Sequence, residues 1–343
     1  MEEKVLDLLK SINHDVSSVF VDFIERTGNN KAAIIHTEKN VFFAKNYFKS
    51  NSDIKDRFQS EVSLFEYAKE CAPDFVPNIY AIDEINRIIL FEKISGKNVK
   101  SEELDTNLIL IAASFFSSLN KPEFKFPLGS KINNAAEACF SINNHLDLIE
   151  KRIITLEKAI EDDLEYQNAS STISLIRSAF EKIKYHILNY ANQNMIQLDL
   201  EIEINDRVLS PSDFGFHNCL KKENGDLVFF DFEYSGWDDP AKVIGDFFNQ
   251  LQVPVPEKYF EIFFEKAFEN QKNKNELFTR SKLLLPLYKI KWACIAMNIF
   301  IPVNLERRMF SNPNLDIINY KEEQIQKAKN ILNNIQNNKN GIY

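Results

Sequence analysis

Residues 207–240 read RVLSPSDFGFHNCLKKENGDLVFFDFEYSGWDDP, and the interpretation of the whole chain starts from this stretch. Three short apolar runs predict strands at Arg207–Leu209, Cys219–Lys221 and Leu227–Phe230. Between them lie the turn-forming segments SPSDFGFHN and ENGD. Because only a short turn separates the second and third runs, they predict a β-hairpin whose outer ends lie close together.

Side chains suited to phosphoryl-transfer chemistry flank this hairpin. Asn218 comes just before its first strand, Asp231 comes just after its second strand, and Asp213 precedes Asn218 on the same loop. Mg²⁺ prefers carboxylate or amide oxygens together with substrate phosphates, so Asn218 and Asp231 are the candidate metal ligands. Asp213 can then lie opposite the metal and accept the proton of a hydroxyl group. On its own, an aspartate in this setting is often only a turn cap.

The N-terminal part of the chain predicts a small antiparallel sheet with one helix. Five apolar-rich runs separated by turn signals predict its strands: Ser18–Glu25, Lys31–His36, Asn40–Tyr47, Pro77–Ile82 and Arg87–Phe91. A helix is expected from a cap at Ser52 to about residue 70, where Pro73 ends it. Gly96 follows the last strand, and we take it as the boundary between two lobes.

Helical patterns dominate the rest of the chain. From about residue 101 to 200 the apolar spacing is almost wholly helical, and the pattern returns beyond Pro240 to about residue 331. The small sheet, the hairpin and these helices together predict an α+β protein with a small N-terminal lobe and a larger, mostly helical lobe.

Composition excludes several classes of function. A chain of 343 residues exceeds the usual size of one domain, which favours two domains or two lobes. The formal net charge of −9 argues against a nucleic-acid partner. The apolar runs are too short to span a membrane and the N-terminus lacks a signal-peptide core, so we expect a cytoplasmic protein. The four cysteines show neither zinc-ligand spacing nor a disulfide framework.

The combination of Asp213, Asn218, the triplet Asp231-Phe232-Glu233 and the following GWDDP resembles the aminoglycoside phosphotransferase and choline kinase-like family, which has a protein-kinase-like fold. The resemblance implies that Asp213 is the catalytic base and that Asn218 and Asp231 hold the metal. It further implies a two-lobed fold, with ATP and Mg²⁺ as cofactors and a small-molecule hydroxyl as the phosphate acceptor.

The N-terminal half carries the same resemblance. Lys45, at the end of the strand in VFFAKNYF, matches the lysine that holds the nucleotide phosphates, and Glu61 in the next helix matches its ion-pair partner. The segment RTGNN resembles the turn over the phosphates, and FEKI resembles the hinge whose backbone binds adenine. The nucleotide-binding residues implied by these segments are Gly28, Asn29, Asn30, Glu92 and Ile94.

The sequence departs from the family pattern within the catalytic loop. The family usually has His-Gly-Asp ending in the base, whereas this chain has Pro211-Ser212-Asp213. The histidine that the family places two residues after the base is replaced by Gly215. We expect Pro211 to stiffen the same turn through its fixed φ.

For three further residues the sequence allows two alternative roles each. His217 invites a general-base role, or it hydrogen-bonds the loop. Glu233 either supports the metal site or faces solvent, and Trp237 either stacks on a substrate or is a core aromatic. Asp239 precedes Pro240 and is expected to stabilise the start of a helix.

The sequence therefore predicts an ATP-dependent phosphotransferase with a nucleotide-binding lobe at residues 1–94 and a catalytic, substrate-binding lobe at residues 95–343. The stretch GWDDPAKVIGDF stands where protein kinases carry Ala-Pro-Glu, which favours a small metabolite, sugar, amino alcohol or aminoglycoside-like acceptor. Two alternatives stay open. One is a catalytically silent nucleotide-binding module, and the other is a metal-dependent phosphoesterase that needs neither Lys45 nor a nucleotide.

Overall fold

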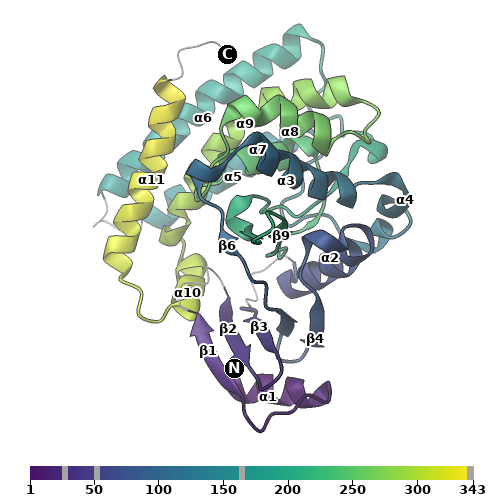
Figure 1. The fold of residues 1–343 in the computed structure, drawn as a ribbon. Helices are drawn as coiled ribbons and strands as arrows, with labels where there is room; N and C mark the ends of the chain where they lie inside the picture. The colour runs from purple at the N-terminus through teal and green to yellow at the C-terminus, as the bar shows by residue number, and fades with distance from the viewer. Residues whose placement is uncertain (25–29, 50–54, 162–166, 338–343) are drawn as a thin grey trace.

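The computed structural model describes residues 1–24, 30–49, 55–161 and 167–337. Figure 1 shows a small sheet at the N-terminal end of the molecule and a larger, mostly helical body beyond it. The strands of this sheet are β1 (Phe20–Ile24), β2 (Lys31–His36), β3 (Val41–Asn46), β4 (Ile79–Asp83) and β5 (Ile88–Glu92). They pair antiparallel in the order β1-β2-β3-β5-β4.

One helix covers each face of the sheet, because successive residues of a strand point to opposite faces. On one face Ile88 and Leu90 of β5 share a core with the apolar side of α1 (Glu2–Ser11). On the other face Ile89 and Phe91 pack with α2 (Arg57–Cys71). The Phe65 ring of α2 lies 4.9 Å from Phe91 and 4.6 Å from Phe232. Helix α2 thus joins the sheet to the segment that follows Asp231.

The remaining helices form the larger body. They are α3 (Thr106–Leu119), α4 (Pro122–Lys125), α5 (Ile142–Glu161), α6 (Gln167–Gln193), α7 (Pro240–Asn249), α8 (Phe260–Ala267), α9 (Lys274–Ala296), α10 (Pro302–Ser311) and α11 (Ile317–Asn337). Helix α9 runs through the middle and contacts α5, α6, α7 and α11 (Figure 1). The segment Lys274–Phe300 is long and apolar enough to span a membrane, but 72% of its most apolar window is buried inside the protein, as in a core helix.

Two further small sheets form from strands that follow the N-terminal sheet in the chain. One contains β6 (Lys97–Asn98), β8 (Cys219–Lys221) and β9 (Leu227–Phe229), and the other contains β7 (Val208–Ser210) and β10 (Gly236–Asp238). A Cβ at Gly96 would lie 2.9 Å from the carbonyl oxygen of Lys221, so only glycine allows β6 to approach β8 this closely. The chain therefore passes directly from the N-terminal sheet to the predicted hairpin.

The predicted fold class is confirmed, and β2 and β8 have the predicted bounds. The expected cap at Ser52 was wrong for the helix observed. Ser52 itself lies outside the described residues, and α2 begins at Arg57 because Asp56 Oδ1 accepts the N–H of Gln59. The prediction of almost continuous helix from 101 to 200 was also wrong, since residues 126–141 contain only one 3₁₀ turn and no α-helix. The short strands β6 and β10 were not predicted.

Candidate active site

The side chain of Lys45 joins three segments that are far apart in the sequence. Its Nζ atom donates to Glu61 Oε2 of α2 at 2.7 Å and to Asp231 Oδ1 at 2.5 Å. Glu61 is fully buried, whereas about a third of the Asp231 side chain (35%) is exposed. The ammonium therefore holds the N-terminal sheet, α2 and the loop after β9 together, and Asp231 keeps an accessible face.

Burial and nearby charges shift the pKa values of this cluster. Burial raises the pKa of Glu61 to about 7, and Lys45 opposes that rise only in part. Burial also raises the pKa of Asp231, and the nearby Glu233 carboxylate adds to the shift. For Lys45 burial acts to lower the pKa, but Asp231 and Glu61 outweigh it and the pKa is raised. Lys45 therefore stays charged, whereas Glu61 and Asp231 bind protons more readily than exposed carboxylates do.

Glu233 is buried and extends the cluster toward Asn30, which precedes β2. Its Oε2 accepts from Asn30 Nδ2 at 2.9 Å, and its Oε1 lies 3.5 Å from Arg57 Nη1. Arg57 Nη1 also donates to the Tyr234 hydroxyl at 2.7 Å. Among the described residues, the cluster thus brings three carboxyl groups (Glu61, Asp231 and Glu233) close to the cations of Lys45 and Arg57. The alternative prediction that Glu233 faces solvent was therefore wrong.

The hairpin of β8 and β9 brings Asn218 and Asp231 to one end of the small sheet. Cys219 pairs with Phe229, and the N–H of Phe230 donates to the carbonyl of Asn218 at 3.0 Å. Asp231 follows with φ 67°, a left-handed conformation that is uncommon outside glycine. Such strain is typical of functional sites, where the surrounding structure holds it in place.

Asp213 lies on the loop before β8, with 31% of its side chain exposed. Asn218 Nδ2 donates to the main-chain carbonyl of Asp213 at 2.9 Å, which leaves the amide oxygen of Asn218 for another partner. His217 Nε2 lies 3.1 Å from Asp213 Oδ1. Burial acts to raise the pKa of Asp213, but His217 and Lys291 outweigh it and the pKa is lowered. Asp213 is therefore held as an ionised carboxylate, the state in which its oxygens can accept hydrogen bonds or a proton.

The two predicted hinge residues, Glu92 and Ile94, lie where the chain leaves β5. Glu92 is its last residue, and Oε2 of this side chain accepts from Asn78 Nδ2 at 2.9 Å. The carbonyl of Ile94 accepts from Lys93 Nζ at 2.9 Å, and the N–H of Ile94 makes no hydrogen bond within the described part of the chain. Gly28 and Asn29 lie outside the described residues, so of the predicted phosphate turn only Asn30 has a place in the structure.

The donor set suits Mg²⁺ better than a transition metal. Asp231 offers a carboxylate and Asn218 an amide oxygen, and Mg²⁺ commonly takes one or two such protein ligands plus phosphates. Among the described residues no group of three His, Cys, Asp or Glu side chains is arranged to hold a metal.

A second buried ionic cluster lies between α7 and α9, near Asp213, and the sequence analysis did not predict it. Lys291 of α9 donates to both carboxylate oxygens of Asp246 in α7 at 2.8 Å, and Trp292 Nε1 donates to Asp246 Oδ1 at 3.0 Å. Nearby, the buried Asp239 carboxylate contacts Arg280 Nε at 2.8 Å. The sequence did contain a signal for this cluster, since Asp246 and Lys291 stand among apolar residues of α7 and α9. Charged residues buried in this way must find partners in the core.

Asp239 and Trp237 have structural roles. The Asp239 side chain accepts the N–H of Ala241 at 2.7 Å and so caps α7, as predicted. Trp237 Nε1 donates to the carbonyl of Gly129 at 3.0 Å, and its ring stacks on Phe126. Of the two readings of Trp237, the structural one agrees with these contacts.

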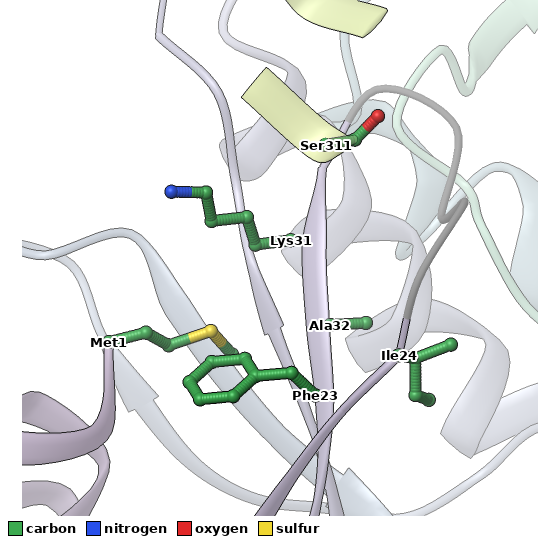
Figure 2. Close-up of a pocket in the computed structure, with 6 residues that line it drawn as sticks. All are labelled: Met1, Phe23, Ile24, Lys31, Ala32 and Ser311. Carbon is green, nitrogen blue, oxygen red and sulfur yellow. The ribbon is translucent and has the colours of Figure 1, made fainter. Parts of the chain in front are cut away.

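A cavity of about 260 Å³ lies apart from these groups, between strands β1 and β2 and the end of α10 (Figure 2). Its lining residues are Met1, Phe23, Ile24, Lys31, Ala32 and Ser311. None of the predicted catalytic or metal-binding side chains takes part in the lining.

Comparisons with known proteins identify the fold. No protein-family profile matches the chain, and no curated protein sequence matches it either. Among solved structures, choline kinase from Cryptosporidium parvum is 14% identical with a TM-score of 0.60, and the match covers 97% of each chain. The choline kinase LicA from Streptococcus pneumoniae is 18% identical with a TM-score of 0.57, covering 97% of this chain and 99% of LicA.

A spectinomycin phosphotransferase solved with ADP and spectinomycin is 12% identical with a TM-score of 0.55, covering 96% of this chain and 98% of that one. The identities are low, so the likeness concerns the fold. Because the likeness spans nearly the whole length of all three structures, it includes both the sheet and the helical body. The fold implied by the resemblance is thereby confirmed, and the chain has the fold of the choline kinases and aminoglycoside phosphotransferases.

Proposed function

We propose that this chain is a Mg²⁺- and ATP-dependent phosphotransferase that moves the γ-phosphoryl group of ATP to a hydroxyl of a small molecule. The observation that carries the proposal is the contact of Lys45 with both Glu61 and Asp231. A phosphoesterase that uses water has no need of this lysine. A nucleotide-dependent enzyme needs a fixed cation for the phosphates beside the metal ligand.

Each residue has a distinct part in the proposed reaction. Lys45, fixed by Glu61, would hold the phosphates, while Asp231 and Asn218 would hold Mg²⁺. The metal ion supplies charge neutralisation on the phosphate oxygens when it is bound. Asp213 would orient the acceptor hydroxyl and take its proton as the hydroxyl oxygen bonds to the γ-phosphorus. The bond from that phosphorus to the bridging oxygen breaks at the same time, and ADP leaves.

The two lobes and the hinge belong to this proposal. Residues 1–94 would form the nucleotide-binding lobe and residues 95–343 the catalytic lobe, joined where β6 pairs with β8. In the proposed complex the carbonyl of Glu92 and the N–H of Ile94 bind the adenine edge. Asn30, together with the neighbouring Gly28 and Asn29, would approach the phosphates. We expect the protein to act in the cytoplasm, where ATP is available.

A phosphoryl-transfer assay tests the proposal. The protein is incubated with Mg²⁺-ATP and, separately, choline, ethanolamine, spectinomycin or streptomycin, the compounds named with the similar kinases. Mass spectrometry then detects the phosphorylated acceptor and ADP. We expect transfer to at least one acceptor and none with Asp213→Asn. Binding of Mg²⁺-ATP without transfer to any acceptor would favour the catalytically silent alternative.

A further inference from the structure

The His217 ring is enclosed beside the Asp213 carboxylate. Only 6% of the His217 side chain is exposed, and its Nε2 lies 3.1 Å from Asp213 Oδ1. The edge of the ring meets Trp292 at a centroid distance of 6.5 Å and an interplanar angle of 86°. The ring is therefore held between the catalytic loop and α9, with one nitrogen aimed at Asp213.

Gly215 provides the space that the ring occupies. A Cβ at this position would lie 2.8 Å from His217 Nδ1 and 3.1 Å from the Cγ of Gln250. Cβ atoms do not come as close as 2.8 Å to another heavy atom, so a side chain at 215 would require the imidazole to shift from its place. The observed orientation of His217 therefore requires glycine at position 215.

The two ring nitrogens have different surroundings, and this difference indicates where the proton lies. Nδ1 of His217 is buried and has no hydrogen-bond partner among the described residues. Nε2 faces a carboxylate oxygen, which can only accept. The ring therefore carries its proton on Nε2 and donates it to Oδ1 of Asp213.

This arrangement rules out His217 as the base for an acceptor hydroxyl. Its Nε2 is occupied by Asp213, and its Nδ1 is enclosed where no acceptor reaches it. What His217 can do is fix the plane of the Asp213 carboxylate. Asn218 already holds the main chain of Asp213, so both ends of that residue are restrained.

We propose that His217 is a positioning residue for phosphoryl transfer: its Nε2–H holds Oδ1 of Asp213, and Oδ2 is thereby directed toward the acceptor hydroxyl. This inference rests on the proposed function. It assigns a role to a residue that touches neither the nucleotide nor the acceptor, and it explains why glycine stands at 215. Misplacing a reacting group by about 1 Å can cost about 100-fold in rate, so the effect is measurable.

Two amide variants of matched polarity test the role. Glutamine places its side-chain nitrogen as many bonds from Cα as His Nε2 is, whereas the asparagine side chain is one bond shorter. With Mg²⁺-ATP and choline, ethanolamine, spectinomycin or streptomycin as acceptor, His217→Asn should lower kcat by about 10- to 100-fold with unchanged KM for ATP. His217→Gln should restore most of that loss. Equal kcat values for the two variants, or a loss that appears only in KM, would overturn the proposal.

A spectroscopic measurement separates this inference from the proposed function. In protein with ¹⁵N-labelled histidines, the His217 signal is assigned by its disappearance in His217→Gln. We expect a proton bonded to Nε2 whose resonance shifts strongly in Asp213→Ala, while the other four histidines stay unchanged. A bare Nε2, or a resonance insensitive to Asp213, would refute the contact. If the wild type transfers phosphate to no acceptor, the proposed function fails and the role in transfer fails with it, whereas the spectrum still decides whether the contact exists.

Discussion

Replacing Lys45 by methionine should destabilise the protein, because the Lys45 ammonium contacts the carboxylates of Glu61 and Asp231. The same change should remove nucleotide binding, because this ammonium is the group proposed to hold the phosphates. Glu61 is fully buried and would lose the one positively charged contact that it has among the described residues, while Asp231 is partly exposed and would be rehydrated. Above pH 7, where Glu61 is ionised beside Lys45, removing one partner of a buried ion pair costs about 3–5 kcal/mol, so the stabilities are compared there. With the contribution of Asp231 discounted for its exposure, we expect a loss of about 3 kcal/mol in the free energy of unfolding.

The double variant Lys45→Met/Glu61→Gln separates the unpaired charge from the loss of packing. Replacing both members of a buried pair by neutral groups is often close to neutral in stability, so we expect the second change to restore about 2 kcal/mol of the loss. Urea denaturation followed by circular dichroism measures these differences. Lys49→Met is the matched control, since Lys49 is exposed, and it should cost less than about 0.5 kcal/mol. A Lys45→Met variant as stable as the control, or no recovery in the double variant, would refute the reasoning.

Three other predictions follow from the same structure. Asp231→Asn should abolish the Mg²⁺ dependence of ATP binding measured by calorimetry, whereas Asp213→Asn should bind Mg²⁺-ATP with nearly wild-type affinity and lack transfer; equal losses would refute the assigned roles. Burial raises the pKa of Glu61 from 4.5 to about 7, so the native state retains a proton that the unfolded chain releases. The free energy of unfolding should therefore fall as pH rises from about 4.5 to 7, and this component should be missing in Glu61→Gln, as urea titrations at several pH values would reveal. Gly245→Ala would place a Cβ 2.1 Å from Tyr288 Cγ, where α7 crosses α9. This change should lower the free energy of unfolding, measured by thermal denaturation, by about 1–3 kcal/mol or more. An unchanged stability would contradict the close packing of these helices.

Local patterns predicted the elements whose signal lies within the element itself. β2 and the hairpin of β8 and β9 have apolar runs bounded by turn residues, and the structure has them at or within one residue of the predicted bounds. The family resemblance implied that Lys45 and Glu61 form an ion pair, and their side chains do. The contact of Lys45 with Asp231 was not predicted. The predicted features depend on sequence spacing and on one resemblance.

Features that depend on tertiary contacts were not predictable in this way. β6 has only two residues, Lys97 and Asn98, and it is a strand only because β8 lies beside it. The N-cap of α2, Asp56, was not predicted. Several polar residues nearby can cap a helix, and which of them does so depends on where the chain enters the helix from the sheet. The contact of His217 with Asp213 requires the loop conformation and the space at Gly215, neither of which has a periodic signal.

The central claim is that Asp213, Asn218, Asp231 and Lys45 form a working phosphoryl-transfer site. Its most direct test is to incubate the wild type and Asp213→Asn with Mg²⁺-ATP and a polar small-molecule extract of cells, and to search by mass spectrometry for compounds that gain one phosphoryl group. We predict a hydroxyl compound that gains a phosphoryl group in proportion to ADP formed, with the wild type alone. A protein that binds Mg²⁺-ATP yet phosphorylates nothing in the extract, or an Asp213→Asn variant as active as the wild type, would contradict the claim.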